Sequence, residues 1–479
     1  MARLIYTLLF YLATPGIFLR LLWRSRLQPE YRRHWGERFG LYAKAIPSDA
    51  PLIWLHAVSV GETRAAAPLI AGLLAAFPGH RLLLTAMTPT GRAAGRELYN
   101  DEPRILQAYL PYDLPDAMRR FYLHFRPCLG MLMETELWPN LLAVAEAHRL
   151  PVLLVNARLS RRSARGYARI DALARPALAR LTAVAAQSAA DARRLRLLGA
   201  PRVEICGNLK FDARPAPELL AQGEEWRVRL QKPLPPALRA TALAAGGMTR
   251  LRLRGSCPEG TEGEHGGEIN EERGTTRSAG GRLRPIWLAA STREGEEALL
   301  LDILPELKTL PIPPLLVLVP RHPQRFDAVE KLARERGFRL TRRSQALPGA
   351  EDAIWLGDSM GEMAAYYRLA DAAFIGGSLL PFGGQNLIEA AACGCPALIG
   401  PHTFNFSQAS MDAIHSGAAR RVSDAKELAA ALQHLLSDPA ARATMRQAGL
   451  DFAARHQGAT GRILAMVEKV RAAGGASDA

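Results

Sequence analysis

The stretch from Pro51 to Glu62, PLIWLHAVSVGE, sets the pattern from which the fold is predicted. Its apolar run is typical of a buried strand that ends in a glycine turn, and the next residues, TRAAAPLIAGLLAAF, have the apolar spacing of an amphipathic helix. Arg81 to Arg92, RLLLTAMTPTGR, repeats the order of strand, turn and helix start. Strands that alternate with helices at this spacing predict a parallel sheet with crossover helices.

The same alternation occurs in both halves of the chain. In the first half it continues through CLGMLMETELWPN, LPVLLVNARLS and PRVEICGNLKFD, which ends at Asp212. A second series begins at Arg284 with RPIWLAASTREGEE and continues through LLVLVPRHP, AIWLGDSMGE and DAAFIGGS. We therefore predict an α/β protein with two Rossmann-like domains that face a cleft.

The segment between the two series, from about Pro235 to Leu283, is rich in Gly, Arg, Glu and Thr and lacks apolar periodicity. Such a composition buries too little apolar surface to offset the entropy of ordering the chain. The pattern predicts a disordered insertion between the two domains.

Composition and charge bound the class of protein. The 479 residues, 48% of them hydrophobic, are enough for two large cores. The formal net charge of +15 favours an anionic partner, which could be nucleic acid, anionic lipid or an acidic substrate. A preference for Arg over Lys across the chain accounts for the charge equally well. The five cysteines are odd in number and form no C-x-x-C pair, which fits a cytosolic, reduced and metal-free protein.

An uncharged apolar run near the N-terminus, Leu4 to Leu19, predicts a membrane anchor. It is shorter than the roughly 20 residues that a spanning helix prefers, and extending it to Trp23 past Arg20 nearly closes the gap. The arginines follow the apolar run, which argues against a signal peptide and keeps the rest of the chain cytoplasmic. A buried core helix is the alternative.

Three motifs of the first half place charged residues directly after strands, where ligands bind in open α/β sheets. Glu62 in SVGET could act as a general base or could simply cap the next helix. Glu134 and Glu136 in METELWPN form a second candidate pair. Lys210 in GNLKFD could neutralise a substrate carboxylate or a leaving phosphate, or could be an ordinary surface lysine.

In the second half, loops after strands carry cations and glycines. Arg293 in STREGEE and Arg321 with His322 in VPRHP lie at expected loop tips, and Arg321 is the preferred phosphate or base ligand. The run GGSLLPFGGQNLIEAAACGCP combines a glycine-rich loop with a helix start near Asn386. Such a loop lets the backbone approach a phosphate, and Glu389 could accept from ribose hydroxyls.

The second half lacks other common nucleotide and metal motifs. The glycine run is neither the dinucleotide pattern G-x-G-x-x-G nor a Walker A loop, so nicotinamide and ATP are poor candidates. No acidic D-x-D pair stands in a plausible metal position. We therefore expect cations and helix dipoles, and no metal, to stabilise a leaving phosphate.

Taken together, these motifs resemble those of the bacterial 3-deoxy-D-manno-octulosonic acid (Kdo) transferases of lipid A biosynthesis. The shared segments run in the same order from the anchor to about Phe406. They are YRRHWGERFG, HAVSVGE, TPTG, YLPYDLPD, METELWPN, NARLS, GNLKFD, STREGEE, VPRHP, GDSMGE, GGSLLPFGGQN and GPHTFNF.

The resemblance implies a GT-B glycosyltransferase that uses CMP-Kdo as donor and a tetra-acylated lipid A precursor, lipid IVA, as acceptor. It implies an inverting transfer without a metal cofactor, at the cytoplasmic face of the inner membrane, where anionic lipids are partners and nucleic acid is not. The expected organisation is an anchor at 1–26, an acceptor-binding domain at 27–215, a linker with the insertion at 216–283, a CMP-sugar domain at 284–455, and a C-terminal helix and tail at 456–479.

The resemblance also assigns roles to residues. Glu62 matches the proton acceptor, and Glu134 and Lys210 match residues that stabilise the transition state. The segments that match the CMP-binding residues are Pro320 with Arg321, Met360 with Gly361 and Glu362, and Asn386 with Leu387, Ile388 and Glu389. Two features depart from the family pattern: Gln385 stands where some relatives have His, and the insertion replaces a short linker.

Two other functions stay open at this point. Another nucleotide-sugar enzyme of the same architecture, such as a UDP-sugar transferase or an epimerase, would bind UDP in place of CMP. A non-catalytic, membrane-tethered protein that binds anions would present aromatic residues among its basic ones. Only 7% of the chain is aromatic, mostly within apolar runs, which disfavours this second alternative.

Overall fold

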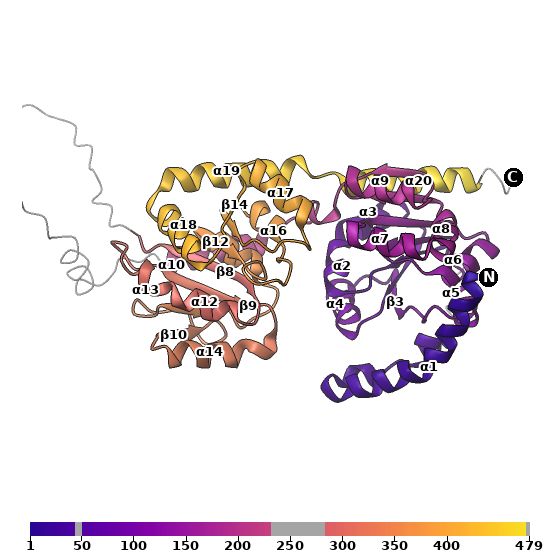
Figure 1. Ribbon diagram of the computed structural model, residues 1–479, viewed down its shortest axis with the longest axis horizontal. Coiled ribbons are helices and arrows are strands. Elements are labelled where there is room, and N and C mark those ends of the chain that lie inside the picture. The colour runs from indigo at the N-terminus through magenta and orange to yellow at the C-terminus, as the bar shows by residue number, and fades with distance from the viewer. Residues whose placement is uncertain (44–49, 231–282, 476–479) are drawn as a thin grey trace, which may run out of the picture. The chain divides into compact units, whose positions relative to one another are not determined.

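The computed structural model describes residues 1–43, 50–230 and 283–475. The chain forms two compact units, one of residues 1–214 and 455–479 and the other of residues 215–454. Figure 1 shows both units, coloured along the chain. Residues 231–282, which hold nearly all of the predicted insertion and Cys257, lie outside the described residues.

The first unit is built on a parallel sheet of seven strands in the order β3-β2-β1-β4-β5-β6-β7. Its strands are β1 Leu52–His56, β2 Arg81–Ala86, β3 Ile105–Tyr109, β4 Leu129–Met133, β5 Val152–Ala157, β6 Ala183–Ala186 and β7 Val203–Ile205. The order reverses between β1 and β4, which pair in parallel. Loops that leave the carboxyl ends of two such strands diverge and form a natural binding site.

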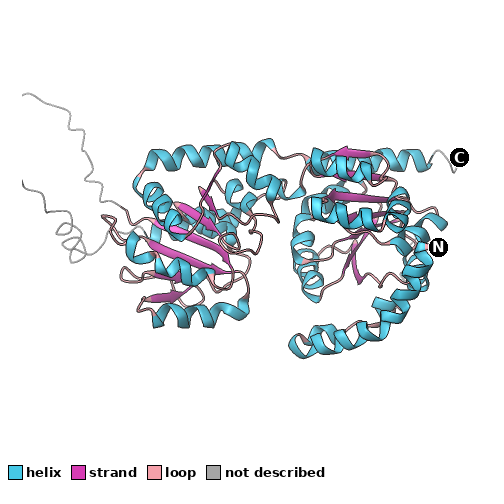
Figure 2. Cartoon of the chain, in the orientation of Figure 1, coloured by secondary structure: helices cyan, strands magenta, loops and turns pink. Residues whose placement is uncertain are grey.

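Helices cover both faces of this sheet, as Figure 2 shows. They are α1 Ala2–Leu27, η1 Pro29–Arg32, η2 Gly36–Phe39, α2 Val60–Ala65, α3 Ala67–Ala76, α4 Pro89–Tyr99, α5 Pro115–Phe125, α6 Pro139–Ala147, α7 Arg161–Arg169, α8 Asp171–Ala179, α9 Ala189–Leu197, η3 Leu209–Phe211 and α20 Ala459–Gly475. All five residues of β1 are buried, because helices pack on both of its sides.

The C-terminal helix α20 completes the core of the first unit. Ile463 and Val467 are fully buried beside residues of α3. Asp212 accepts hydrogen bonds from the backbone N–H groups of Gly458 at 2.7 Å and Thr460 at 2.5 Å, where α20 begins. The predicted C-terminal helix therefore exists, and it belongs to the first unit.

The second unit repeats the architecture with a parallel sheet in the order β10-β11-β9-β8-β12-β13-β14. Its strands are β8 Ile286–Thr292, β9 Leu315–Pro320, β10 Leu340–Arg342, β11 Ile354–Leu356, β12 Ala372–Ile375, β13 Ala397–Ile399 and β14 Ala419–Arg421. Its helices are α10 Pro217–Leu230, α12 Glu296–Asp302, α13 Leu304–Leu307, η4 Pro323–Arg325, α14 Phe326–Glu335, α15 Met363–Leu369, α16 Leu387–Ala392, α17 Ser407–His415, α18 Ala425–Ser437 and α19 Pro439–Arg455.

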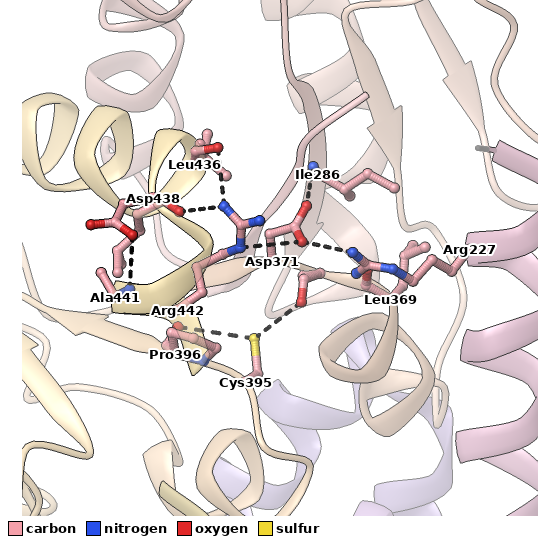
Figure 3. A network of polar contacts seen from close by, with 12 residues as sticks. Arg227, Ile286, Leu369, Asp371, Cys395, Pro396, Leu436, Asp438, Ala441 and Arg442 are labelled. Atoms are coloured by element: carbon pink, nitrogen blue, oxygen red, sulfur yellow. Dashed lines mark hydrogen bonds and ion pairs between the residues drawn. The ribbon is translucent and has the colours of Figure 1, made fainter. Parts of the chain in front are cut away.

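Helix α10 lies in the segment that the sequence analysis assigned to a linker, and it packs on the second unit instead. Arg227 donates to Asp371 at 2.7 Å and to the carbonyl of Leu369 at 2.7 Å. Asp371 also accepts from the N–H of Ile286, the first residue of β8, at 2.9 Å (Figure 3). Arg442 on α19 approaches the same carboxylate at 3.8 Å. The buried Asp371 therefore ties α10 and α19 to the sheet.

The predicted α/β fold with two Rossmann-like domains is confirmed, as is an apolar helix at the N-terminus. Helix α1 is long and apolar enough to cross a membrane, by length and composition alone.

Candidate functional site

One candidate site lies in the first unit, at the carboxyl edge of its sheet and at the point where the strand order reverses. Glu62 follows β1, and Glu134 follows β4, the strand that pairs with β1. Because parallel strands end at the same edge, the topology brings these two carboxylates together.

Glu62 lies in the first turn of α2, with Ser59 at the N-cap. Its Oε2 accepts a hydrogen bond from the backbone N–H of Val58 at 2.9 Å, and its Oε1 accepts one from the hydroxyl of Ser59 at 3.0 Å. The side chain is half-buried. The carboxylate is thus held in one orientation and keeps access to a ligand.

The environment of Glu62 raises its pKa to about 7. The main cause is burial, which disfavours the charged form, and the charges of Glu134 and Glu136 add to the effect. The hydrogen bonds from Val58 and Ser59 act in the opposite direction. A carboxyl group with a pKa near neutrality is suited to accept a proton at physiological pH.

Glu134 has a backbone conformation that few residues other than glycine adopt. Its φ is 59°. Its N–H donates to the carbonyl of Val155 at 3.0 Å, and its carbonyl accepts from the N–H of Arg158 at 3.3 Å. This conformation directs the side chain out of the strand immediately after Met133. Left-handed backbone at a non-glycine residue is costly and recurs at functional sites.

Lys210 lies beside Glu134, with its Nζ 3.4 Å from Oε1. Asn208 caps the short 3₁₀ helix that carries Lys210, and Asn156 accepts from the N–H of Leu209 at 3.0 Å. Asn156 itself has a left-handed φ of 52° at the end of β5. Asn156, with its left-handed backbone, and Asn208, as the helix cap, therefore place Lys210 against the carboxylate of Glu134.

The structure adds Arg158 and His56, which the sequence analysis did not select, and separates the two members of the predicted pair Glu134 and Glu136. Arg158, from the NARLS motif, approaches Glu134 Oε2 at 4.0 Å. Glu136 accepts from the indole N–H of Trp138 at 2.7 Å, which makes it the anchored member of the carboxylate pair. His56 ends β1 beneath the site, and burial lowers its pKa to about 3, so the ring is neutral. The sequence signal that could have pointed to Arg158 is the position of its motif, NARLS, directly after a predicted strand.

Another candidate site lies in the second unit, at the carboxyl edge of its sheet. Arg321 follows β9 and donates from Nε to Gln385 Oε1 at 3.2 Å. Arg293 follows β8, lies 3.2 Å from His322 Nε2 and places its guanidinium over the ring of Phe382. Burial and the charges of the neighbouring arginines lower the pKa of His322. This edge is therefore positively charged.

A buried carboxylate holds the glycine loop that follows β12. Glu296 accepts backbone hydrogen bonds from Arg293 at 2.9 Å and from three successive residues, Gly377 at 2.6 Å, Ser378 at 3.0 Å and Leu379 at 3.1 Å. Its neighbour Glu297 accepts a bidentate pair from Arg325 at 2.7 and 3.1 Å. The sequence analysis quoted STREGEE for its arginine, and the structure gives Glu296 and Glu297, two of its three glutamates, the role of supports.

The predicted CMP-binding residues fall into two groups by exposure. Met360 is 56% exposed and Gly361 borders open space, whereas the side chains of Pro320, Leu387 and Ile388 are buried. Only the backbone of these buried residues could meet a ligand.

Three further predicted residues lie at the starts of helices. Glu362 precedes α15 and accepts from Arg343 at 2.8 Å and Gln222 at 3.3 Å. Asn386 caps α16 by accepting from the N–H of Ile388 at 3.3 Å, and Glu389 lies in the first turn of the same helix. Glu362 is thus already paired within its unit.

Comparisons with known proteins decide the family. The family model described as 3-deoxy-D-manno-octulosonic-acid transferase (kdotransferase) matches residues 33–213, and that of group 1 glycosyl transferases matches residues 334–452. The 3-deoxy-D-manno-octulosonic acid transferase of Bordetella pertussis is 38% identical over 98% of this chain and 99% of its own. The chain belongs to the Kdo transferase family.

A second Kdo transferase agrees with this assignment, and a solved structure shows the fold. The enzyme of Haemophilus influenzae is 32% identical over 98% of each chain. The structure of a UDP-GlcNAc 2-epimerase from Neisseria meningitidis, 13% identical, covers 88% of this chain and all of its own with a TM-score of 0.53. This likeness and the match to the group 1 glycosyl transferases confirm the predicted GT-B fold. As a member of the Kdo transferase family, the protein is a glycosyltransferase.

Proposed function

We propose that this Kdo transferase moves Kdo from CMP-Kdo to a tetra-acylated lipid A precursor with inversion, and that Glu62 is the proton acceptor. The observation that carries the proposal is Glu62 itself, a half-buried, oriented carboxylate with a pKa raised to about 7 at the reversal point of the first sheet. Membership of the Kdo transferase family supports Kdo as the transferred sugar. The lipid acceptor and the inversion at the anomeric carbon are proposals.

The proposed reaction is a single displacement. The Glu62 carboxylate removes the proton from a primary hydroxyl of the glucosamine acceptor, and the hydroxyl oxygen forms a bond to the anomeric carbon of Kdo. The bond from that carbon to the phosphate oxygen breaks, and CMP leaves with the electron pair. Attack opposite the leaving group inverts the anomeric centre.

Cations and an oriented carboxylate are proposed to stabilise the transition state. Lys210 and Glu134 form a pair at 3.4 Å, so the lysine can meet the carboxylate of Kdo while Glu134 faces the positive charge that develops on the sugar. Arg321 is proposed to bind the CMP phosphate together with the segments Met360 to Glu362 and Asn386 to Glu389. These groups supply the charge that a metal would otherwise provide.

The proposed acceptor and location fit the N-terminal helix and the overall charge. Helix α1 carries an apolar surface, and arginines follow along and after it. The net charge of +15 suits an anionic lipid acceptor and an anionic leaflet. We therefore place the enzyme at the cytoplasmic face of the inner membrane.

Mass spectrometry of the products tests the reaction directly. The chain is incubated with CMP-Kdo and lipid IVA, and the proposal expects lipid products heavier by one or more Kdo residues. The anomeric configuration of the product, determined by NMR, tests inversion. Unmodified lipid IVA, with Kdo transferred to another acceptor, would contradict the proposed acceptor.

Nucleotide protection tests the donor separately. CMP is expected to raise the unfolding temperature of the second unit more than UDP at the same concentration, since a bound ligand stabilises the folded state. Stronger protection by UDP would instead favour a UDP-sugar enzyme.

A further inference from the structure

The first half of α1 is held on the first unit by polar side chains. Tyr6 donates its hydroxyl to Asp113 Oδ2 at 3.0 Å, and Thr7 donates to Asn140 Oδ1 at 3.0 Å. Both acceptors are buried, and Asp113 also accepts from the backbone N–H of Asn140 and Leu141 where α6 begins. The anchor helix is therefore bonded into the polar framework of the domain.

Further along α1, a hydrogen bond from Tyr11 and the apolar contacts of Phe18 and Leu21 continue the docking. Tyr11 donates to Asp116 on α5. Phe18 stacks on Phe39 with ring centroids 4.8 Å apart and nearly parallel rings, and Leu21 is buried. Contacts with the first unit thus extend over at least 16 residues, about 22 Å of helix at 1.5 Å per residue.

The opposite face of α1 is an apolar stripe that runs along the helix. Its side chains are each 47–70% exposed: Leu4, Ile5, Leu8, Leu9, Leu12, Leu19, Leu22 and Trp23. Successive residues turn by about 100° in a helix, which places most of this stripe away from Tyr6, Thr7 and Phe18. The helix contains Pro15, and Figure 2 shows it bent as it follows the first unit. The residues of α1 that contact the domain and those that are exposed and apolar therefore alternate along the same part of the helix, on its two opposite faces.

A recess joins the stripe to the domain. It has a volume of about 740 Å³ and is lined by Tyr11, Thr14, Pro15, Phe18 and Leu19 of α1 and by Phe39, Leu114, Asp116 and Arg120. Tyr11 and Leu19 belong to both the exposed residues and the lining. Most of the lining residues are apolar, and Asp116 and Arg120 are the charged ones, so the recess continues the apolar stripe up to an ion pair.

A membrane-spanning position of α1 conflicts with these contacts. The hydrocarbon core is roughly 30 Å thick, so a spanning α1 would carry its docked partners into lipid or lose them. Asp116 and Arg120 form an exposed ion pair at 2.7 Å beside Tyr11, and charged groups are costly within hydrocarbon. Undocking would leave buried Asp113 and Asn140 without the donors from α1.

We infer that α1 lies in the plane of the leaflet, with one face docked on the first unit and its apolar stripe inserted among acyl chains, and that it does not cross the bilayer. This inference rests on the proposed membrane location, and it adds the orientation of α1 relative to the membrane plane. The cations Arg20, Arg24 and Arg26 then lie at the level of anionic headgroups, where basic residues bind.

A disulfide staple separates the two arrangements. In the full chain carrying Thr7→Cys and Asn140→Cys, oxidation locks α1 on the first unit, and flotation with vesicles of phosphatidylethanolamine and phosphatidylglycerol measures binding. The inference expects oxidised and reduced protein to bind within about twofold of each other. Binding by the reduced form alone would overturn it. Failure of the unmodified chain to float would overturn the membrane location as well, and neither outcome depends on Kdo transfer.

Thiol labelling gives an independent readout in membranes. Ala2→Cys is compared with Cys128, an exposed native thiol of the first unit, using a membrane-impermeant maleimide on inverted and right-side-out vesicles. Peptide mass spectrometry is expected to find both thiols labelled in the same vesicle preparation. Labelling of the two thiols in opposite preparations would show a spanning helix and overturn the inference.

The docking contacts have a matched control. Tyr6→Phe combined with Thr7→Val is expected to increase hydrogen exchange in α1 severalfold, because both donors are lost. Tyr99→Phe removes a buried hydroxyl that makes no hydrogen bond within the described residues, and it should leave α1 unchanged. Equal exchange in all three proteins would contradict the docked arrangement.

Discussion

Glu62 and Glu296 occupy matching places in the two units and have different surroundings. Each follows a glycine, Gly61 or Gly295, and lies in the first turn of the helix after the first strand of its sheet. Glu296 is fully buried and accepts four backbone N–H groups, whereas Glu62 is half-buried and accepts two hydrogen bonds. The same local sequence thus gives a structural support in one unit and a candidate base in the other.

The comparison shows that partners and access decide the role of a carboxylate after a strand. The bonds of Glu296 order the glycine loop and leave no exposed oxygen for a substrate. Glu62 lies instead among other carboxylates, which help to raise its pKa. The residues around each glutamate should therefore respond differently to substitution.

The largest expected effect on stability is that of Glu296→Ala. Four N–H groups lose their acceptor, and each such group costs roughly 1–3 kcal/mol when buried, so we expect a loss of at least roughly 4 kcal/mol in the free energy of unfolding of the second unit. Urea denaturation measures it. Glu62→Ala, as the matched variant of the first unit, should cost less than about 1 kcal/mol, and equal losses would break the comparison.

The pair between Lys210 and Glu134 is expected to matter mainly for turnover. Lys210→Met should slow turnover by a factor of roughly 10²–10³, the usual effect of removing a group that stabilises a developing charge. Arg158→Met is the control, because this more exposed arginine lies 4.0 Å from the same carboxylate. A loss from Arg158→Met as large as that from Lys210→Met would remove the special role of the lysine.

The raised pKa of Glu62 predicts that its ionised carboxylate destabilises the fold. Between its ordinary pKa of about 4.5 and its folded pKa of about 7, the folded state binds the proton and the unfolded state does not. Stability therefore falls as the pH rises through this range. Glu62→Gln should unfold at a higher temperature than the native chain at pH 8 and at nearly the same temperature at pH 4.5. The opposite order at pH 8 would contradict the assigned environment.

The smallest expected effect is that of Gln385→Ala. It removes one hydrogen bond to Arg321, and a net contribution of roughly 0.5–1.5 kcal/mol corresponds to a rise in the KM for CMP-Kdo by a factor of about 2–10. Initial-rate kinetics at saturating acceptor measures it. Turnover that slows by about two orders of magnitude, the size of effect expected for a group that stabilises developing charge, would show that Gln385 does more than orient the arginine.

Much of this architecture could be predicted from the sequence, because strands and helices alternate with clear apolar periods. The positions of Glu62, Glu134 and Lys210 after strands followed from the same pattern. The structure brings all three to one edge, where charges of the two glutamates interact and the lysine meets Glu134.

Other features depend on contacts between distant residues, which a local pattern does not contain. The left-handed φ of Glu134 needs the pairing of β4 with β5, and the role of Glu296 needs a glycine loop 81 residues further along the chain. The docking of α10 and α20 rests on Asp371 and Asp212, whose partners are likewise remote in sequence. The apolar composition of α1 also did not decide between a helix that spans the membrane, one that lies in its surface and one that is buried in the domain.

The pH dependence of kcat/KM tests the role of Glu62 most directly, because this quantity reports groups of the free enzyme. The native chain is expected to show an acid limb with an apparent pKa of about 7, as the base must be deprotonated to act. Glu62→Gln should lack this limb and react more slowly by a factor of roughly 10²–10⁴, while CMP still protects it against unfolding. Near-normal turnover with the acid limb retained in Glu62→Gln would contradict the account.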